Sequence, residues 1–172
     1  MIEALSNRLA VRMKKINPDE TASVEVMSFA LQGILHNTIT ALTALVAAFL
    51  LGHFWETVLT IAFFMLLRTF SGGYHFKSAL ACFIVSASVF ILIPLIEVSN
   101  TTLLVLNLIS LVLVAIYAPS NIKEHIRFPE KFFPVFKILC IVLVSLNFFY
   151  LESLVTIAFF VQSCSLITLK RR

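Results

Sequence analysis

Long apolar runs broken by short polar segments dominate this sequence. A helix of about 20 apolar residues crosses the hydrocarbon core of a bilayer. Dividing the chain at its polar segments predicts spans over residues 26–50, 54–68, 78–97, 101–118, 132–149 and 152–169. The run at 54–68 is short for a crossing, so four spans with interfacial segments is the alternative count. The predicted fold class is all-α, a polytopic bundle of about six transmembrane helices.

Residues 1–17 follow a different pattern, in which apolar and basic positions alternate with a helical period. The apolar positions recur at three- and four-residue steps, and they are Ile2, Leu5, Leu9, Met13 and Ile16. The basic positions are Arg8, Arg12, Lys14 and Lys15. This pattern predicts an amphipathic helix in the inner-leaflet interface, beside anionic lipid. Its role is either that of a simple anchor or that of a docking surface for an amphipathic substrate, and the two roles are compatible.

Composition supports the membrane interpretation. Hydrophobic residues make up 60% of the chain and charged residues 13%, and the mean hydropathy is +1.00. A soluble chain of this length cannot bury that much apolar surface, whereas a bilayer solvates it directly. We therefore predict a single integral membrane domain over residues 1–172.

The charges give an independent test of the span count. With six spans, every basic residue lies at or near one side of the membrane, and these residues are Arg8, Arg12, Lys14, Lys15, Arg68, Lys77, Lys123, Arg127, Lys131, Lys137, Lys170, Arg171 and Arg172. The turns on the other side carry Glu56, Glu97 and Glu152. The positive-inside rule makes the basic side cytoplasmic, with both termini inside. Because topology explains the basic residues, no nucleic-acid partner is expected.

A polar break between the second and third runs carries the candidate chemistry. Arg68 ends one run, Gly72-Gly73 follows, and His75 precedes Cys82 by seven residues. If the chain is helical from His75 onward, that spacing places the imidazole and the thiol on one face. A histidine beside a cysteine is the minimum equipment for a thiolate nucleophile, and a nearby arginine favours the anion. Backbone amides around Gly72-Gly73 would hold an oxyanion.

Other polar residues offer weaker candidates. Glu25, Gln32 and His36 follow helical spacing on the first span, where they either hydrogen-bond between helices or line the site. His53 and Glu56 provide too few ligands for a metal site, so no metal is expected. Cys140 and Cys164 lie inside predicted spans as packed thiols, and no disulfide is expected on a reducing cytoplasmic side.

The run Arg68-x-x-x-Gly72-Gly73-x-His75-x6-Cys82 resembles the signature of the accessory gene regulator B family of Gram-positive bacteria. The resemblance implies a cysteine endopeptidase of the bacterial cytoplasmic membrane with no cofactor, whose active site faces the cytoplasm. Such an enzyme cuts a quorum-sensing propeptide on the C-terminal side of the future signal and holds the signal as an acyl-thioester. An internal thiol or hydroxyl of the peptide then closes a thiolactone or lactone.

Position by position, the resemblance makes Cys82 the nucleophile and His75 its base, with Arg68 and Gly73 as required motif positions. It also implies a homodimer and a substrate with an amphipathic leader and an acidic C-terminal tail. The basic inner face predicted above would attract such a tail. The alternative is a non-enzymatic small transporter or peptide-secretion component, which needs no nucleophile and would tolerate Cys82→Ser.

Overall fold

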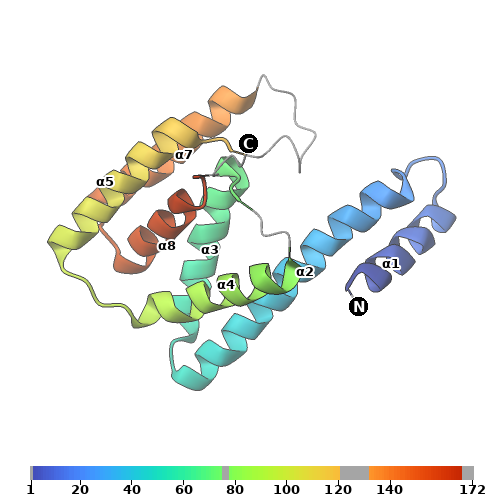
Figure 1. Ribbon diagram of the computed structural model, residues 1–172, viewed down its shortest axis with the longest axis horizontal. Helices are drawn as coiled ribbons and strands as arrows, with labels where there is room; N and C mark the ends of the chain where they lie inside the picture. Colours follow the sequence, from blue (N-terminus) through green and yellow to red (C-terminus); the bar gives the residue numbers. More distant parts are fainter. Residues whose placement is uncertain (1, 75–77, 121–131, 168–172) are drawn as a thin grey trace.

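The computed structural model describes residues 2–74, 78–120 and 132–167 (Figure 1). Its helices are α1 (Ile2–Ile16), α2 (Val24–Leu51), α3 (Phe54–Ser71), α4 (Ala79–Leu92), α5 (Asn100–Tyr117), α7 (Phe133–Leu146) and α8 (Ser153–Cys164). Two short 3-10 turns, η1 (Ile93–Leu95) and η3 (Asn147–Phe149), extend α4 and α7. No β-strand occurs in this part of the chain, so the all-α prediction is confirmed.

A helix occupies each of the six predicted span positions, but their lengths differ. Three helices are long and apolar enough to cross a membrane, namely α2, α3 and α5, with 28, 18 and 18 residues. The apolar helices at the other positions are shorter and cover Ala79–Leu95, Phe133–Phe149 and Ser153–Cys164. By length and composition, the described residues therefore contain three membrane-spanning helices, and the count of six stays a prediction.

The ends of two helices near the candidate chemistry differ from the predicted span ends. α3 continues to Ser71, beyond the predicted end at 68, and stops where Gly72 adopts φ 71°. Glycine accepts this conformation without steric cost. α8 ends at Cys164, short of the predicted 169, because Ser165 turns back and its Oγ donates a 2.7 Å hydrogen bond to the Gln162 carbonyl.

α3 lies at the centre of the molecule and packs against α7 and α8 on one side and α2 and α4 on the other (Figure 1). One buried apolar cluster joins α3 to α5, α7 and α8 and consists of Leu67, Val114, Ala118, Cys140, Val144, Val155, Phe159 and Leu166. The other joins α3 to α2, α4 and α8 and consists of Ala44, Phe64, Phe90, Ile93, Ile157 and Ala158. Leu67 and Phe64, three residues apart, face different clusters, so apolar packing on two sides fixes α3.

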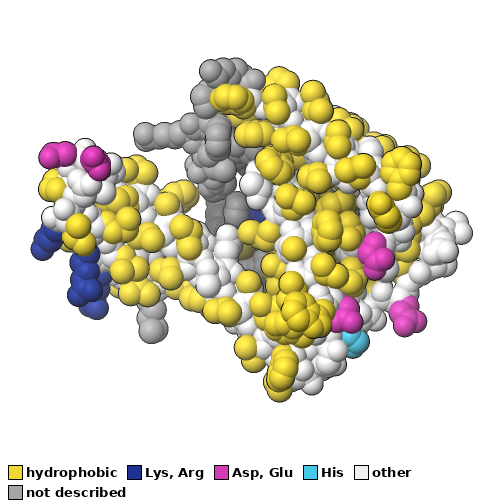
Figure 2. Space-filling model, turned by 180° about the vertical axis from the view of Figure 1, so that it is seen from behind, with side chains coloured by type: hydrophobic (Ala, Val, Ile, Leu, Met, Phe, Trp, Pro, Cys, Tyr) yellow, Lys and Arg dark blue, Asp and Glu magenta, His cyan; other side chains and the backbone are white. Residues whose placement is uncertain are grey.

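Much of the outer surface is apolar, as Figure 2 shows. Phe49, Leu50 and Ile116 are 70%, 79% and 63% exposed. Lipid solvates such residues, whereas water would not. Figure 2 also shows acidic side chains in two places, one at the end far from α1 and one on the N-terminal arm near the cations of α1. The predicted separation of charge across the membrane and the side that faces the cytoplasm stay predictions.

α1 packs along the first half of α2 and extends with it away from the other helices (Figure 1). Its contact face consists of small residues, since Ser6 and Ala10 are fully buried. Lys14, near the end of α1, stabilises the turn that connects α1 to α2. Its Nζ donates hydrogen bonds to the Pro18 and Thr21 carbonyls, at 2.6 and 2.8 Å. The predicted apolar stripe stays largely outside this contact, because Met13 is 44% and Ile16 83% exposed. Its insertion into lipid stays a prediction.

A buried polar cluster ties α5, α7 and α8 together near the end opposite Arg68. The Asn147 side-chain nitrogen donates to Asn107 Oδ1 at 3.1 Å and to Thr156 Oγ1 at 2.7 Å. Asn107 in turn donates to the Val144 carbonyl at 3.3 Å. Asn107 and Thr156 are fully buried and Asn147 is 6% exposed. Such pairing offsets the cost of removing amides from water.

Replacing Asn147 with leucine removes a donor shared by two buried acceptors. We expect Asn147→Leu to lower the free energy of unfolding in detergent micelles by about 1–2 kcal/mol, because both acceptors lose their partner. Thr43→Val is the control, since its hydroxyl is exposed and bonds only to the Ile39 carbonyl of its own helix. The control should change stability by less than about 0.5 kcal/mol. Equal effects of both substitutions would contradict a stabilising role for the cluster.

Candidate active site

Cys82 lies in the first turn of α4, half-buried. The helix begins at Ala79 because Ser78 caps it, with Ser78 Oγ accepting a 3.4 Å hydrogen bond from the Ala81 amide. The helix therefore begins one residue after the predicted span start at 78, and the condition of a continuous helix from His75 to Cys82 is not met. His75 itself lies outside the described residues. Cys82 thus lies near a helix N-terminus, a position where reactive cysteines often occur.

Arg68, in the last turn of α3, lies close enough to Cys82 for their charges to interact. Its guanidinium is held from two sides. Nη1 donates to Gln162 Oε1 and Nη2 donates to the Tyr74 carbonyl, both at 3.1 Å. The guanidinium carbon also lies 5.9 Å from the centre of the Phe64 ring. These contacts hold the cation at the edge of the helix pair formed by α3 and α4.

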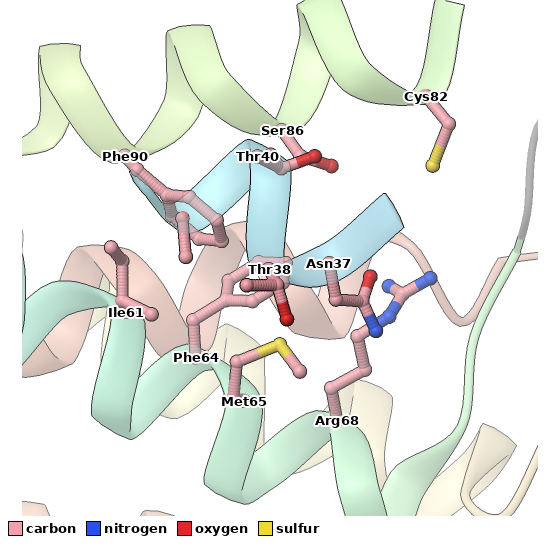
Figure 3. A pocket seen from close by; sticks show the side chains of 11 residues that line it. Asn37, Thr38, Thr40, Ile61, Phe64, Met65, Arg68, Cys82, Ser86 and Phe90 are labelled. Carbon is pink, nitrogen blue, oxygen red and sulfur yellow. The ribbon is translucent and has the colours of Figure 1, made fainter. Parts of the chain in front are cut away.

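Arg68 and Cys82 line a pocket of about 250 Å³ between α2, α3 and α4. Figure 3 shows the Cys82 sulfur directed toward the guanidinium, with the Asn37 side-chain amide beside it. Further from Cys82 the lining turns apolar and consists of Ile61, Phe64, Met65 and Phe90. The pocket therefore combines a polar end at the thiol with an apolar interior.

A second pocket of about 290 Å³ shares Phe64, Arg68, Cys82 and Ser86 with the first. It extends toward the end of α8, and the residues that line it there are Val161, Cys164, Ser165 and Ile167, together with Tyr74. Cys82 and Arg68 thus stand where two cavities meet. A bound chain could occupy both cavities while passing the thiol.

Gly72 and Gly73 form a docked loop whose amides are already bonded within the protein. Both have positive φ, 71° and 137°. Gly72 N donates to the Arg68 carbonyl at 2.9 Å, Gly73 N to the Ser120 carbonyl at 3.1 Å, and Tyr74 N to the Ser165 carbonyl at 2.8 Å. The hydrogens of these three amides are therefore engaged within the protein, and the predicted oxyanion role of the amides around Gly72-Gly73 stays a prediction.

Sequence reasoning missed Gln162, which lies fully buried on α8 beneath this loop. Its Nε2 donates to the Gly72 carbonyl at 2.6 Å and to Ser71 Oγ at 3.0 Å. The available signal was a lone side-chain amide directly after the largely apolar run 153–161. Its partners lie some 90 residues away, so periodicity gave no means of pairing them.

The polar residues predicted on the first span lie outside both pockets. Glu25 is exposed, and Gln32 Nε2 donates to Ser28 Oγ of its own helix at 3.5 Å. His36 Nε2 is buried without a hydrogen-bond partner. The residues of α2 that do line the first pocket are Asn37, Thr38, Thr40 and Ala41. One residue corresponds to about 100° around a helix, which explains why the neighbour of His36 reaches the pocket instead.

The remaining cysteines and possible ligands add little to the site. Cys140 is buried in the apolar core, as expected of a packed thiol, whereas Cys164 is exposed and lines the second pocket. Within residues 2–74, 78–120 and 132–167, no group of three or more His, Cys, Asp or Glu side chains could hold a metal ion.

A side chain at Gly73 cannot be accommodated without rearrangement, since its Cβ would lie 2.6 Å from Ser165 Oγ. We expect Gly73→Ala to lower the free energy of unfolding by about 1–3 kcal/mol and to make the 72–78 segment more sensitive to limited proteolysis. Gly33→Ala is the matched control, because no atom lies within 4 Å of the position that its Cβ would take. That substitution should be neutral or stabilising. Equal proteolysis of both variants would contradict tight docking of the loop.

Comparisons with known proteins show the family of this chain. The family model of accessory gene regulator B matches residues 3–169. An AgrB-like protein of Halalkalibacterium halodurans is 35% identical over 86 residues, 50% of this chain and 44% of that protein. The accessory gene regulator protein B of Staphylococcus aureus strain RF122 is 32% identical over 116 residues, 65% of this chain and 62% of its own. That of Staphylococcus saprophyticus is 28% identical over 134 residues, 76% of this chain and 70% of its own.

The matched part spans about half the length of the first relatives, 44% and 56% for those of H. halodurans and Staphylococcus intermedius. No solved structure matches the chain. The family match nevertheless covers nearly all of the sequence, including the whole segment from Arg68 to Cys82. The chain therefore belongs to the accessory gene regulator B family.

Proposed function

We propose that this chain is a membrane cysteine endopeptidase that cleaves the C-terminal part of a quorum-sensing propeptide and promotes cyclisation of the signal. Family membership supports a role in quorum sensing. The observation that carries the enzymatic proposal is the position of Cys82, which lies beside the Arg68 cation at the meeting point of two pockets. A nucleophile with a cavity on each side suits a peptide bound across it.

In the first step, His75 takes the proton of the Cys82 thiol and the thiolate attacks the scissile carbonyl carbon. Cys82 lies in the first turn of α4 and lines two pockets together with Arg68, whereas Cys140 is buried among apolar side chains. A helix N-terminus and a nearby cation are the surroundings in which reactive cysteines occur.

The tetrahedral intermediate needs hydrogen-bond donors for its oxyanion, and the Gly72-Gly73 amides are engaged. Arg68 and Asn37 line the same pocket as Cys82, and their side chains carry suitable N–H groups. We assign them this role. As the intermediate collapses, the C–N bond breaks and the imidazolium of His75 gives its proton to the leaving amine. The N-terminal part of the peptide remains as a thioester on Cys82.

In the second step, an internal thiol or hydroxyl of the bound peptide attacks the thioester carbonyl. His75, neutral again after the first step, takes the proton of that thiol or hydroxyl. The bond to Cys82 then breaks, His75 passes the same proton to the Cys82 thiolate, and a thiolactone or lactone is released. A thioester exchanges with another thiol at little net cost, whereas hydrolysis would waste the acyl group. Substrate covering the pocket would keep water from the thioester.

The substrate partner follows from the same chemistry. The cations of α1 and its exposed apolar residues would suit an amphipathic leader, or anionic lipid of the inner leaflet, or both. The basic inner face would attract an acidic C-terminal tail. We place the enzyme in the bacterial cytoplasmic membrane with both termini and the active site on the cytoplasmic side, working as a homodimer without a cofactor.

The proposal requires that one thiol carry the reaction. Cells co-expressing a tagged propeptide with the Cys82→Ser variant should release at least ~100-fold less C-terminal fragment than cells with the unmodified protein, because the weaker nucleophile lacks activation. Cys140→Ala is the control, since that thiol lies outside both pockets, and it should cleave normally. The measurement is quantitative immunoblotting of membrane fractions at matched protein levels. Cleavage unaffected by Cys82→Ser would overturn the proposal and favour a transporter or secretion component.

A further inference from the structure

Gln162 uses its full hydrogen-bonding capacity on residues at or next to the candidate site. Oε1 accepts from Arg68 Nη1 at 3.1 Å and from Ser165 Oγ at 3.2 Å. Nε2 donates to the Gly72 carbonyl at 2.6 Å and to Ser71 Oγ at 3.0 Å. A primary amide has two donor hydrogens and accepts about two bonds, so none of its capacity is left over. The amide can satisfy this set in a single orientation.

Two of these four hydrogen bonds act directly on residues of the candidate site. The bond from Arg68 fixes the guanidinium whose other nitrogen holds the Tyr74 carbonyl. The bond to the Gly72 carbonyl fixes the start of the loop that leads toward His75. Gln162 therefore couples the cation beside Cys82 to the Gly72–Tyr74 loop, which directly precedes His75 in the sequence. It is not itself a lining residue of either pocket.

We propose that Gln162 is a positioning residue of the peptidase, which sets the guanidinium of Arg68 and the Gly72–Tyr74 loop in their working arrangement. The inference rests on the proposed function, whose catalytic groups it supports. A fully buried amide at the end of an apolar helix is costly unless it is paired, so an apolar side chain would serve packing better. The partners of the Gln162 side chain lie at the site and on its own last turn.

A purely structural role has a counterpart elsewhere in the molecule. The Asn107, Asn147 and Thr156 cluster is also buried and also links helices distant in sequence, but it lies away from the pockets that Cys82 lines. Removing either network leaves buried polar groups without partners and so destabilises the fold to a similar degree. The two networks therefore separate loss of stability from loss of positioning.

Two substitutions divide the functions of the amide. Gln162→Leu removes both the anchor of Arg68 and the donor to the loop. Gln162→Glu keeps an oxygen for Arg68, with a stronger charge-assisted bond, but places an acceptor against the Gly72 carbonyl instead of a donor. We expect the leucine variant to release both Arg68 and the loop, and the glutamate variant to release the loop alone.

The test combines turnover with a readout that needs no propeptide. The first measurement is kcat and KM for propeptide cleavage by folded protein in detergent micelles. The second is the rate of Cys82 alkylation by iodoacetamide between pH 6 and pH 10, followed by mass spectrometry of the Cys82 peptide. Asn147→Leu is the matched control for stability, and both rates are expressed per folded molecule.

For Gln162→Leu we expect kcat to fall about 10- to 100-fold with KM changed less, and the alkylation profile to move to higher pH as the cation leaves Cys82. Gln162→Glu should also lose kcat, because the loop loses its donor. Asn147→Leu should change neither property. Because Gln162→Glu keeps the side-chain shape and an acceptor for Arg68, it also tests the inference if the leucine variant does not fold.

The inference is overturned if Gln162→Leu moves the Cys82 alkylation profile no further than Asn147→Leu does, or if Gln162→Glu retains full kcat. Failure of the proposed function has a different signature. In that case the unmodified protein would not cleave the propeptide at all, while the alkylation profiles would still report whether Gln162 holds the cation beside Cys82.

Discussion

Non-helical backbone beside apolar helices must have its polar groups paired, and the segment from Ser71 to Tyr74 meets this constraint by docking on the ends of α5 and α8. Ser120 accepts from Gly73 N and donates its own amide to the Ser71 carbonyl at 2.9 Å. Ser165 accepts from Tyr74 N, and Gln162 donates to the Gly72 carbonyl. This pairing joins the end of α3, the start of the loop toward α4 and the C-terminal end of α8.

The docking also determines which groups remain available for chemistry. Because the amides of Gly72, Gly73 and Tyr74 are engaged, the proposed mechanism assigns the oxyanion to side chains, and Arg68 and Asn37 line the pocket beside Cys82. Gly73 allows a close approach of backbone to Ser165 and Gln162, since a Cβ there would meet both, and Gly72 adopts a positive φ. Packing of the loop thus explains both glycines, while the proposed nucleophile lies in the first turn of α4.

Much of the fold could be predicted from the sequence, because long apolar runs determine where helices lie. The start of α4 was predicted to within one residue, because the predicted span begins at Ser78, which caps the helix directly before an apolar run. Cys82 and Arg68 were predicted to lie near one another, and the structure brings them into the same pockets. Gln162 could not be predicted, since its pairing with Arg68 spans 94 positions and depends on how α8 packs against α3. Which residue of α2 lines the pocket, Asn37 rather than His36, likewise depends on the rotation of α2 about its axis.

The most direct measurement of the central claim is the intact mass of the protein after incubation with a propeptide whose internal ring-closing residue has been replaced by alanine. Without that nucleophile the acyl-enzyme cannot proceed to a ring and should accumulate. The account predicts an adduct equal to the N-terminal product less one water, located on the Cys82 peptide and removed by hydroxylamine, together with the released C-terminal fragment. Release of that fragment with no adduct on Cys82 at any time would contradict covalent catalysis by this thiol.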